Sequence, residues 1–81
     1  SPESRPKAKK VEDDFAKQFK LTKRELEVLT LIARDCSSKE ISQQLKVSVA
    51  TIATHRKNVM RKLNLHSASA LTKFALENGL V

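Results

Sequence analysis

Apolar residues recur along this chain at the three- and four-residue spacing of helices that turn one side toward a core. Polar capping residues stand at the ends of these apolar runs and set the predicted boundaries. The predicted helices cover about residues 22–34, 38–45, 49–63 and 68–78. A single glycine and two prolines among 81 residues also favour an all-helical chain. We therefore predict an all-α fold, a compact four-helix domain over residues 21–81 with a central helix-turn-helix.

Residues 1–20 are predicted to be a flexible basic linker or tail, because the first ten are rich in Lys and Pro and show no apolar period. Val11, Phe15 and Phe19 follow at four-residue spacing. Either this segment is a short helix that lays its apolar stripe on the domain, or it is loose linker from a neighbouring domain. The sequence leaves both alternatives open.

Short polar motifs predict how the helices begin and end. Thr22 with Glu25, and Ser37 with Glu40, each match a capping box, in which two side chains satisfy backbone amides of the first turn. Similar capping side chains precede the last two helices at Ser48 and Ser67. Residues that tolerate a left-handed backbone are expected to end three of the helices, namely Asp35, Asn64 and Gly79.

Residues 38–63 have the pattern of a helix-turn-helix, a short helix and a long one joined by a turn. At about 100° per residue, three apolar residues of the long helix share one side, which we call the seam: Ile52, Val59 and Leu63. The opposite side, the outward face, carries Ala50, Ala53, Thr54, Lys57 and Arg61. Methyl groups there can meet the thymine methyl, and a lysine can donate to guanine O6 and N7. The alternative is an exposed face that happens to be basic, and the pattern alone does not separate the two.

The distribution of charge adds to this picture. The chain carries a formal net charge of +7, and no acidic residue stands between Ile41 and Leu76. Six cations fall in that interval: Lys46, Arg56, Lys57, Arg61, Lys62 and Lys73. A merely solvated helical surface usually mixes both signs, so a stretch of one sign favours a phosphate-binding face.

Other kinds of chemistry find little support in the residues. One cysteine and two histidines supply no zinc site, and Cys36 is expected to be a small buried hydrophobe. No nucleophile–base pair can be assembled, so we predict no enzyme, no cofactor and no metal. No apolar run approaches the roughly 20 residues of a membrane span, and we expect a cytoplasmic protein.

The last predicted helix has apolar residues on more than one side, which a helix packing on one side only would not need. They are Leu71, Phe74, Ala75 and Leu76. The surplus predicts a homodimer through this helix, with Leu71, Phe74 and Asn78 at the interface. The alternative is that Phe74 closes a small core or packs on Phe15 or Phe19.

Several motifs together resemble the DNA-binding domain of the LuxR/NarL/FixJ family of bacterial regulators. They are LTKRELEVLTLIA, SSKEISQQL, VSVATIATHRKNVMRKLNL and the final ALENGLV. The resemblance covers about residues 21–81 and implies a four-helix domain whose last helix commonly mediates dimer contacts. Members normally carry a sensing domain, and residues 1–20 would suit a connection to a phosphorylatable receiver or to a small-molecule-binding domain.

The resemblance also implies roles for individual residues. Base-reading places fall on Ala53, Thr54 and Lys57, and Arg61 joins them from the outward face. Phosphate-contacting places fall on Ser38, Lys39, Thr51, His55 and Lys62, with Arg56 added from the basic stretch. The family often has Gly, Ala and Lys where this chain has Asp35, Ser42 and Ala53. The last departure leaves Lys57 as the main polar base reader.

The predicted function is sequence-specific binding of double-stranded DNA as the output domain of a bacterial transcription regulator. Residues 49–63 would lie in the major groove, and two copies would bind two half-sites. RNA polymerase is a further partner that this function allows. One alternative is a sigma-factor region-4-like promoter-binding module, against which the last helix argues. The other is a protein-interaction domain on the same fold, against which the basic stretch argues.

Overall fold

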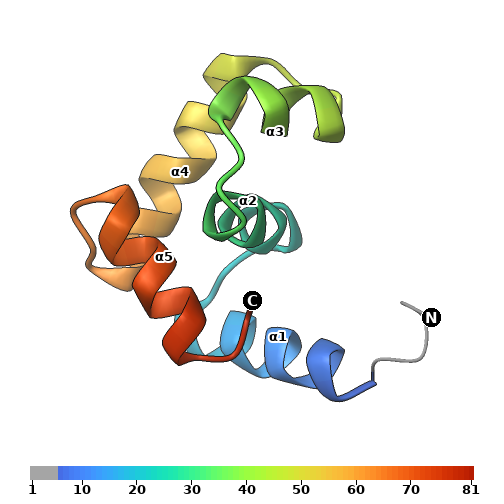
Figure 1. Cartoon of the computed structure of the whole chain (residues 1–81), viewed down its shortest axis with the longest axis vertical. Coiled ribbons are helices and arrows are strands. Elements are labelled where there is room, and N and C mark those ends of the chain that lie inside the picture. The colour runs from blue at the N-terminus through green and yellow to red at the C-terminus, as the bar shows by residue number, and fades with distance from the viewer. Residues whose placement is uncertain (1–5) are drawn as a thin grey trace.

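The computed structural model describes the backbone of residues 6–81 and the side chains from residue 12 onward, and within that range it is all-α. Figure 1 shows the helices α1 (Pro6–Phe19), α2 (Lys23–Ala33), α3 (Ser38–Leu45), α4 (Val49–Leu63) and α5 (Ala68–Glu77). The all-α prediction is confirmed, and the boundaries of the four predicted helices hold to within a residue. All four helices predicted over residues 21–81 are present, and Pro6–Phe19 forms a fifth described helix in the segment for which the sequence left two alternatives open.

The additional helix, α1, is held by aromatic packing. Phe15 is only 4% exposed, and its ring centroid lies 4.8 Å from that of Phe19 and 5.7 Å from that of Phe74 in α5. Of the two alternatives for this segment, the structure has the helix that lays its apolar stripe on the domain. The prediction for residues 1–5, and the side chain of Val11, lie outside the described part of the chain.

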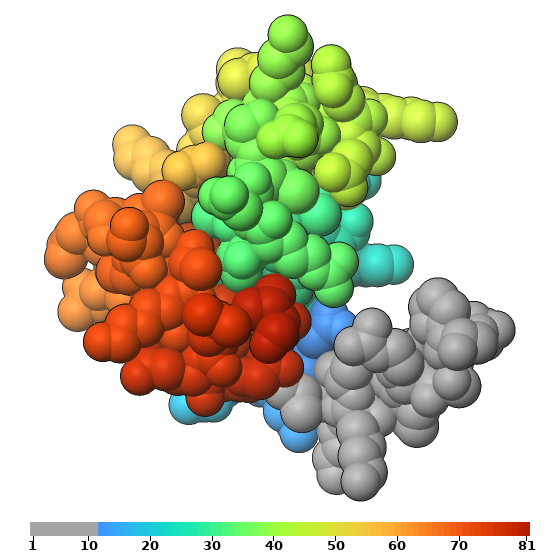
Figure 2. Space-filling view, in the orientation of Figure 1, coloured from blue at the N-terminus to red at the C-terminus, as the bar shows by residue number. Residues whose placement is uncertain are grey.

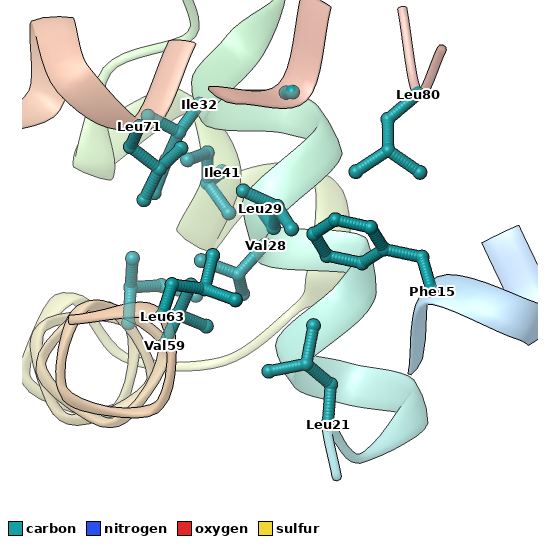
Figure 3. Close-up of a cluster of buried hydrophobic side chains, with 12 residues drawn as sticks. Phe15, Leu21, Val28, Leu29, Ile32, Ile41, Val59, Leu63, Leu71 and Leu80 are labelled. Atoms are coloured by element: carbon teal, nitrogen blue, oxygen red, sulfur yellow. The ribbon is translucent and has the colours of Figure 1, made fainter. Parts of the chain in front are cut away.

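Helix α2 lies at the centre of the fold and contacts each of the other four helices (Figure 1). Val28 and Leu29 are fully buried, and Figure 3 shows them between Val59 of α4 and Phe15 of α1. Val28 and Leu29 lie within about 60° of Ile32 around the helix and share one inward side with it. Thr30, which is also buried, lies on the opposite side. Because α2 is covered on several sides, the apolar period of one face underestimates how much of it is buried.

All five helices end in the same way, with a left-handed residue followed by a backbone bond back into the last turn. The predicted left-handed residues are confirmed, since φ is +67° at Asp35, +57° at Asn64 and +74° at Gly79. Lys20 and Lys46 adopt the same backbone without a sequence signal for it. At the end of α5 the amide of Leu80 donates to the carbonyl of Ala75 (2.9 Å), as a Schellman motif requires. All four predicted caps are also observed, with complete capping boxes on α2 and α3.

The turn between α3 and α4 is short, and the two helices pack against each other. Ser42 fits this crossing because it is 7% exposed and its hydroxyl donates to the carbonyl of Lys39 in its own helix (2.7 Å). The first turns of α4 and all of α3 form one end of the molecule, at the top of Figure 2, whereas α5 lies at the lower left. Helix α3 and the start of α4 are therefore presented away from the α1–α5 contact.

Candidate nucleic-acid interface

The two sides of α4 separate as the spacing predicted. Ile52 and Val59 are fully buried and Leu63 is 6% exposed, so the seam faces the core. The outward face is exposed along its whole length, at Ala50, Ala53, Thr54, Lys57 and Arg61. The structure thus brings the four predicted base-reading residues, Ala53, Thr54, Lys57 and Arg61, onto one accessible side of one helix.

The structure adds Val49 to this face. Val49 is 50% exposed, one of the few large apolar side chains that remain outside the core. At about 100° per residue it lies about 40° around the helix from Ala53 and about 60° from the buried Ile52, so it stands at the edge of the outward face next to the seam. The predicted helix 49–63 begins at Val49, but the outward face predicted from the spacing begins at Ala50. Its exposure extends the outward face to the start of α4.

The hydroxyl groups near the start of α4 are engaged within the helix itself. Thr54 Oγ1 donates to the carbonyl of Ala50 (3.2 Å). Ser48 Oγ accepts from the amide of Thr51 (3.1 Å) and lies 2.9 Å from Thr51 Oγ1. Thr51, a predicted phosphate contact, is therefore part of the cap. Long cationic side chains appear only further along the outward face, at Lys57 and Arg61.

Two predicted phosphate-contacting residues meet each other between α3 and α4. Arg56 Nη1 donates to Ser38 Oγ (3.0 Å), so the guanidinium group is held beside the first turn of α3. Lys39 follows Ser38 on the same turn and is exposed. Glu40 is committed to the capping box, where the backbone amide of Ser37 donates to it (2.8 Å) and lowers the pKa of its carboxyl. The start of α3 therefore offers Lys39 freely and Arg56 in a fixed position.

Lys62 is engaged inside the domain. Its Nζ donates to Glu25 Oε1 (2.6 Å) and to the carbonyl of Lys20 (2.9 Å). Burial alone would raise the pKa of the Glu25 carboxyl, but hydrogen bonds from Lys62 and from Thr22 outweigh burial and lower that pKa. The capping box of α2 is thereby tied to the last turn of α4. In this structure Lys62 therefore holds the end of α4 against the start of α2.

The remaining predicted contact residues, one on α4 and three at α5, differ in how exposed they are. His55 is half-buried at the edge of the seam, so only part of its ring is accessible. On α5, Leu71 is 1% exposed and belongs to the core of its own chain. Phe74 packs on Phe15 and Phe19, which was the alternative to a dimer contact. Asn78 is exposed, and its side-chain amide donates to the carbonyl of Phe74 (2.8 Å).

The exposed apolar residue of α5 is instead Leu76, which is 58% exposed. It lines a groove together with Thr72 and Lys73 of its own helix and Arg56 of α4. Leu76 is therefore the large apolar side chain that α5 offers most openly to a partner.

Among the described residues, no three His, Cys, Asp or Glu side chains gather in a way that could hold a metal ion. None of the described helices is long and apolar enough to cross a membrane. Cys36 is half-buried against the core, and Gln44 Nε2 donates to its sulfur (3.8 Å).

Comparison with known proteins gives a consistent result. The family model described as bacterial regulatory proteins, luxR family, matches residues 20–75. The oxygen regulatory protein NreC of Staphylococcus carnosus is 48% identical over 61 residues, which are 75% of this chain and 28% of NreC. The uncharacterized response regulatory protein YgeK of Escherichia coli K12 is 42% identical over 71 residues, 88% of this chain and 48% of YgeK. The chain thus spans less than half the length of these relatives. No solved structure matches it significantly.

Proposed function

Because the chain belongs to the luxR family of bacterial regulatory proteins, we propose that it binds duplex DNA sequence-specifically, with α4 in the major groove. Membership makes it a helix-turn-helix DNA-binding domain of a bacterial regulator, from a family of non-enzymatic proteins. The observation that supports sequence-specific binding through α4 is the outward face of this helix. It is exposed from Val49 to Arg61 and free of acidic residues, while the opposite side is anchored in the core.

In this proposal the outward face of α4 contacts bases, and the residues at the start of α3 contact phosphates. Lys57 and Arg61 reach base edges from α4, with Ala53 and Thr54 in close approach. Lys39, Ser38 and Arg56 contact the phosphate backbone beside α3, and His55, Thr51 and Lys62 lie near that backbone. Phosphate contacts fix the orientation of the domain and supply most of its salt-dependent affinity, whereas base contacts supply specificity.

We further propose that two copies bind two half-sites about one helical turn apart. The exposed Leu76 supports a contact through α5, together with Asn78 at the end of that helix. RNA polymerase is a further partner of such a complex, since the relatives are named as regulatory proteins.

Selection of bound duplexes from a random pool at two salt concentrations tests the proposal. A shared half-site should emerge, and binding should weaken steeply as salt rises. Recovery of unrelated duplexes at both salt concentrations would contradict sequence-specific binding. The selected duplex then serves to compare two lysine variants.

Lys57→Ala should weaken binding to the selected duplex by about 1–3 kcal/mol and relax the preference at one base pair. Lys39→Ala is the matched control, because it removes the same charge from an exposed position on α3. It should weaken binding to all duplexes alike and reduce the salt slope by about one. Equal losses on all sequences for Lys57→Ala would mean that Lys57 contacts only phosphate.

A further inference from the structure

The first two turns of α4 present an apolar surface at the end of a strongly basic domain. It consists of Val49, Ala50, Ala53 and the methyl group of Thr54, which we call the methyl patch. All four residues are exposed, and Val49 is half-exposed although it is a large apolar side chain. An exposed apolar surface on a binding face indicates an apolar partner group.

Hydrogen bonding within the helix makes the methyl patch more apolar than its sequence suggests. The hydroxyl proton of Thr54 is donated to the carbonyl of Ala50 (3.2 Å). The methyl group is then the part of Thr54 that can meet a base without loss of this bond. The neighbouring hydroxyls of Ser48 and Thr51 lie 2.9 Å apart and share a hydrogen bond with each other. No cationic side chain stands on the outward face before Lys57.

The outward face therefore has two parts along the helix, the methyl patch at its start and a cationic part further on, formed by Lys57 and Arg61. Val49 and Lys57 lie about 12 Å apart along the helix axis at ~1.5 Å per residue. The methyl patch and the cationic part can thus meet different base pairs of one half-site. In the major groove, the apolar group that a base presents is the C5 methyl of thymine.

We propose that the methyl patch recognises thymine C5 methyl groups, with Val49 as a specificity-determining residue beside the bases that Lys57 and Arg61 read. This inference rests on the proposed function. It adds a chemical statement about the target, namely that the half-site contains thymine next to the base pairs contacted by the cationic part. It also assigns a role to Val49, which otherwise exposes apolar surface to water without a partner.

Replacement of single thymines by deoxyuridine tests the proposal, because it removes only the methyl group and keeps base pairing. In the selected duplex, one or two such replacements within the half-site should weaken binding about fourfold each, the loss expected for one buried methyl-sized group. Replacing the same thymine–adenine pair by cytosine–guanine should also weaken binding. Methylation of that cytosine at C5 should then recover about fourfold.

In the Val49→Ser variant, deoxyuridine at one position of the half-site should no longer weaken binding. Deoxyuridine at the other positions should weaken binding as it does in the wild type. Val81→Ser is the matched control, because Val81 is 42% exposed and lies beyond α5. It should change neither affinity nor the deoxyuridine profile. Circular dichroism checks that both variants keep their helical content.

The outcomes separate this inference from the proposed function. If no half-site is selected, the proposed function itself fails. If a half-site is selected but contains no thymine, or if deoxyuridine changes nothing, only the methyl proposal is overturned. If deoxyuridine weakens binding of the Val49→Ser variant as much as binding of the wild type, Val49 does not contact a thymine methyl group.

Discussion

At the scale of single residues, the ion pair between Glu25 and Lys62 shows how one charge can fix the position of α4. The Glu25 side chain is 5% exposed and that of Lys62 is 25% exposed. A buried carboxylate is costly unless it is paired and hydrogen-bonded. Here Lys62 and the amide of Thr22 both donate to the same carboxyl oxygen. The pair therefore connects the start of α2 to the end of α4.

We expect Glu25→Gln to lower the free energy of unfolding by about 1–3 kcal/mol at neutral pH, the range for a charged hydrogen bond. Because the folded-state pKa of Glu25 is lowered, its contribution is fully present above the unfolded-state pKa of about 4.3. It is lost as pH falls through the folded-state pKa. Denaturant titrations at several pH values should show the difference between wild type and variant shrinking on acidification.

The pair formed by Arg24 and Glu27 supplies a control on the same helix. Its atoms are 3.6 Å apart, and the two side chains are 43% and 38% exposed. Glu27→Gln should change stability by less than about 0.5 kcal/mol, since exposed pairs contribute little. If both glutamine variants lost the same stability, the argument for a special role of Glu25 would not hold.

At the scale of elements, α1 changes the definition of the folded unit. All three aromatic residues of the chain, Phe15, Phe19 and Phe74, meet between α1 and α5. Edge-to-face pairs of this kind stabilise beyond their buried area. Figure 3 shows the ring of Phe15 directed toward Leu29 of α2, with Leu80 alongside. Helix α1 therefore covers one side of the central helix as well as α5.

We expect Phe15→Ala to destabilise the domain by about 3–5 kcal/mol, the usual cost of truncating a buried phenylalanine. That is a large part of the 5–15 kcal/mol typical of small domains. Thermal and denaturant unfolding measure the loss. Lys17→Ala is the control, because Lys17 is exposed on the same helix, and it should have an effect within about 0.5 kcal/mol. Equal stability of the two variants would mean that α1 unfolds independently of the rest.

The contrast between α1 and the capping motifs explains what could be predicted from the sequence. Thr22 and Glu25 contact each other across three residues, so their pattern suffices to predict the capping box. The burial of Phe15 depends on Phe74, which lies far along the chain, and no local period reports such a contact. The burial of Thr30, on the side of α2 opposite Ile32, depends likewise on helices that pack around α2. Local signals therefore predicted boundaries, whereas the number of helices required tertiary contacts.

In the candidate interface, too, features set by local spacing could be predicted and features set by tertiary contacts could not. The outward face of α4 was predictable because a regular helix fixes the angle between Ala53, Thr54 and Lys57. The role of Lys62 was not predictable in this way, because its partners, Glu25 and the Lys20 carbonyl, lie on other segments. The family resemblance supplied positions but could not say which cations the fold itself already uses.

At the scale of the whole molecule, the face proposed to bind DNA and the exposed Leu76 of α5 lie apart. The start of α4 and all of α3 lie at one end, whereas α5 lies away from it (Figures 1 and 2). A second copy can contact α5 without covering the outward face of α4. Leu71 and Phe74 hold α5 within its own chain, so their substitution would disturb folding together with any dimer. Leu76 is better suited to test pairing because it is exposed.

We expect Leu76→Glu to weaken binding to a duplex with two half-sites while leaving binding to a single half-site nearly unchanged. A charge at the centre of an apolar contact prevents one bound copy from raising the affinity of the other. For coupled sites this increase in affinity is typically about 5- to 150-fold. Titration of both duplexes by fluorescence anisotropy gives the two affinities. Val81→Glu makes the same change of charge at an apolar residue that is 42% exposed outside α5, and it should leave both affinities alike. Parallel losses on the two duplexes for Leu76→Glu would exclude α5 as the pairing surface, because only a contact between copies distinguishes one half-site from two.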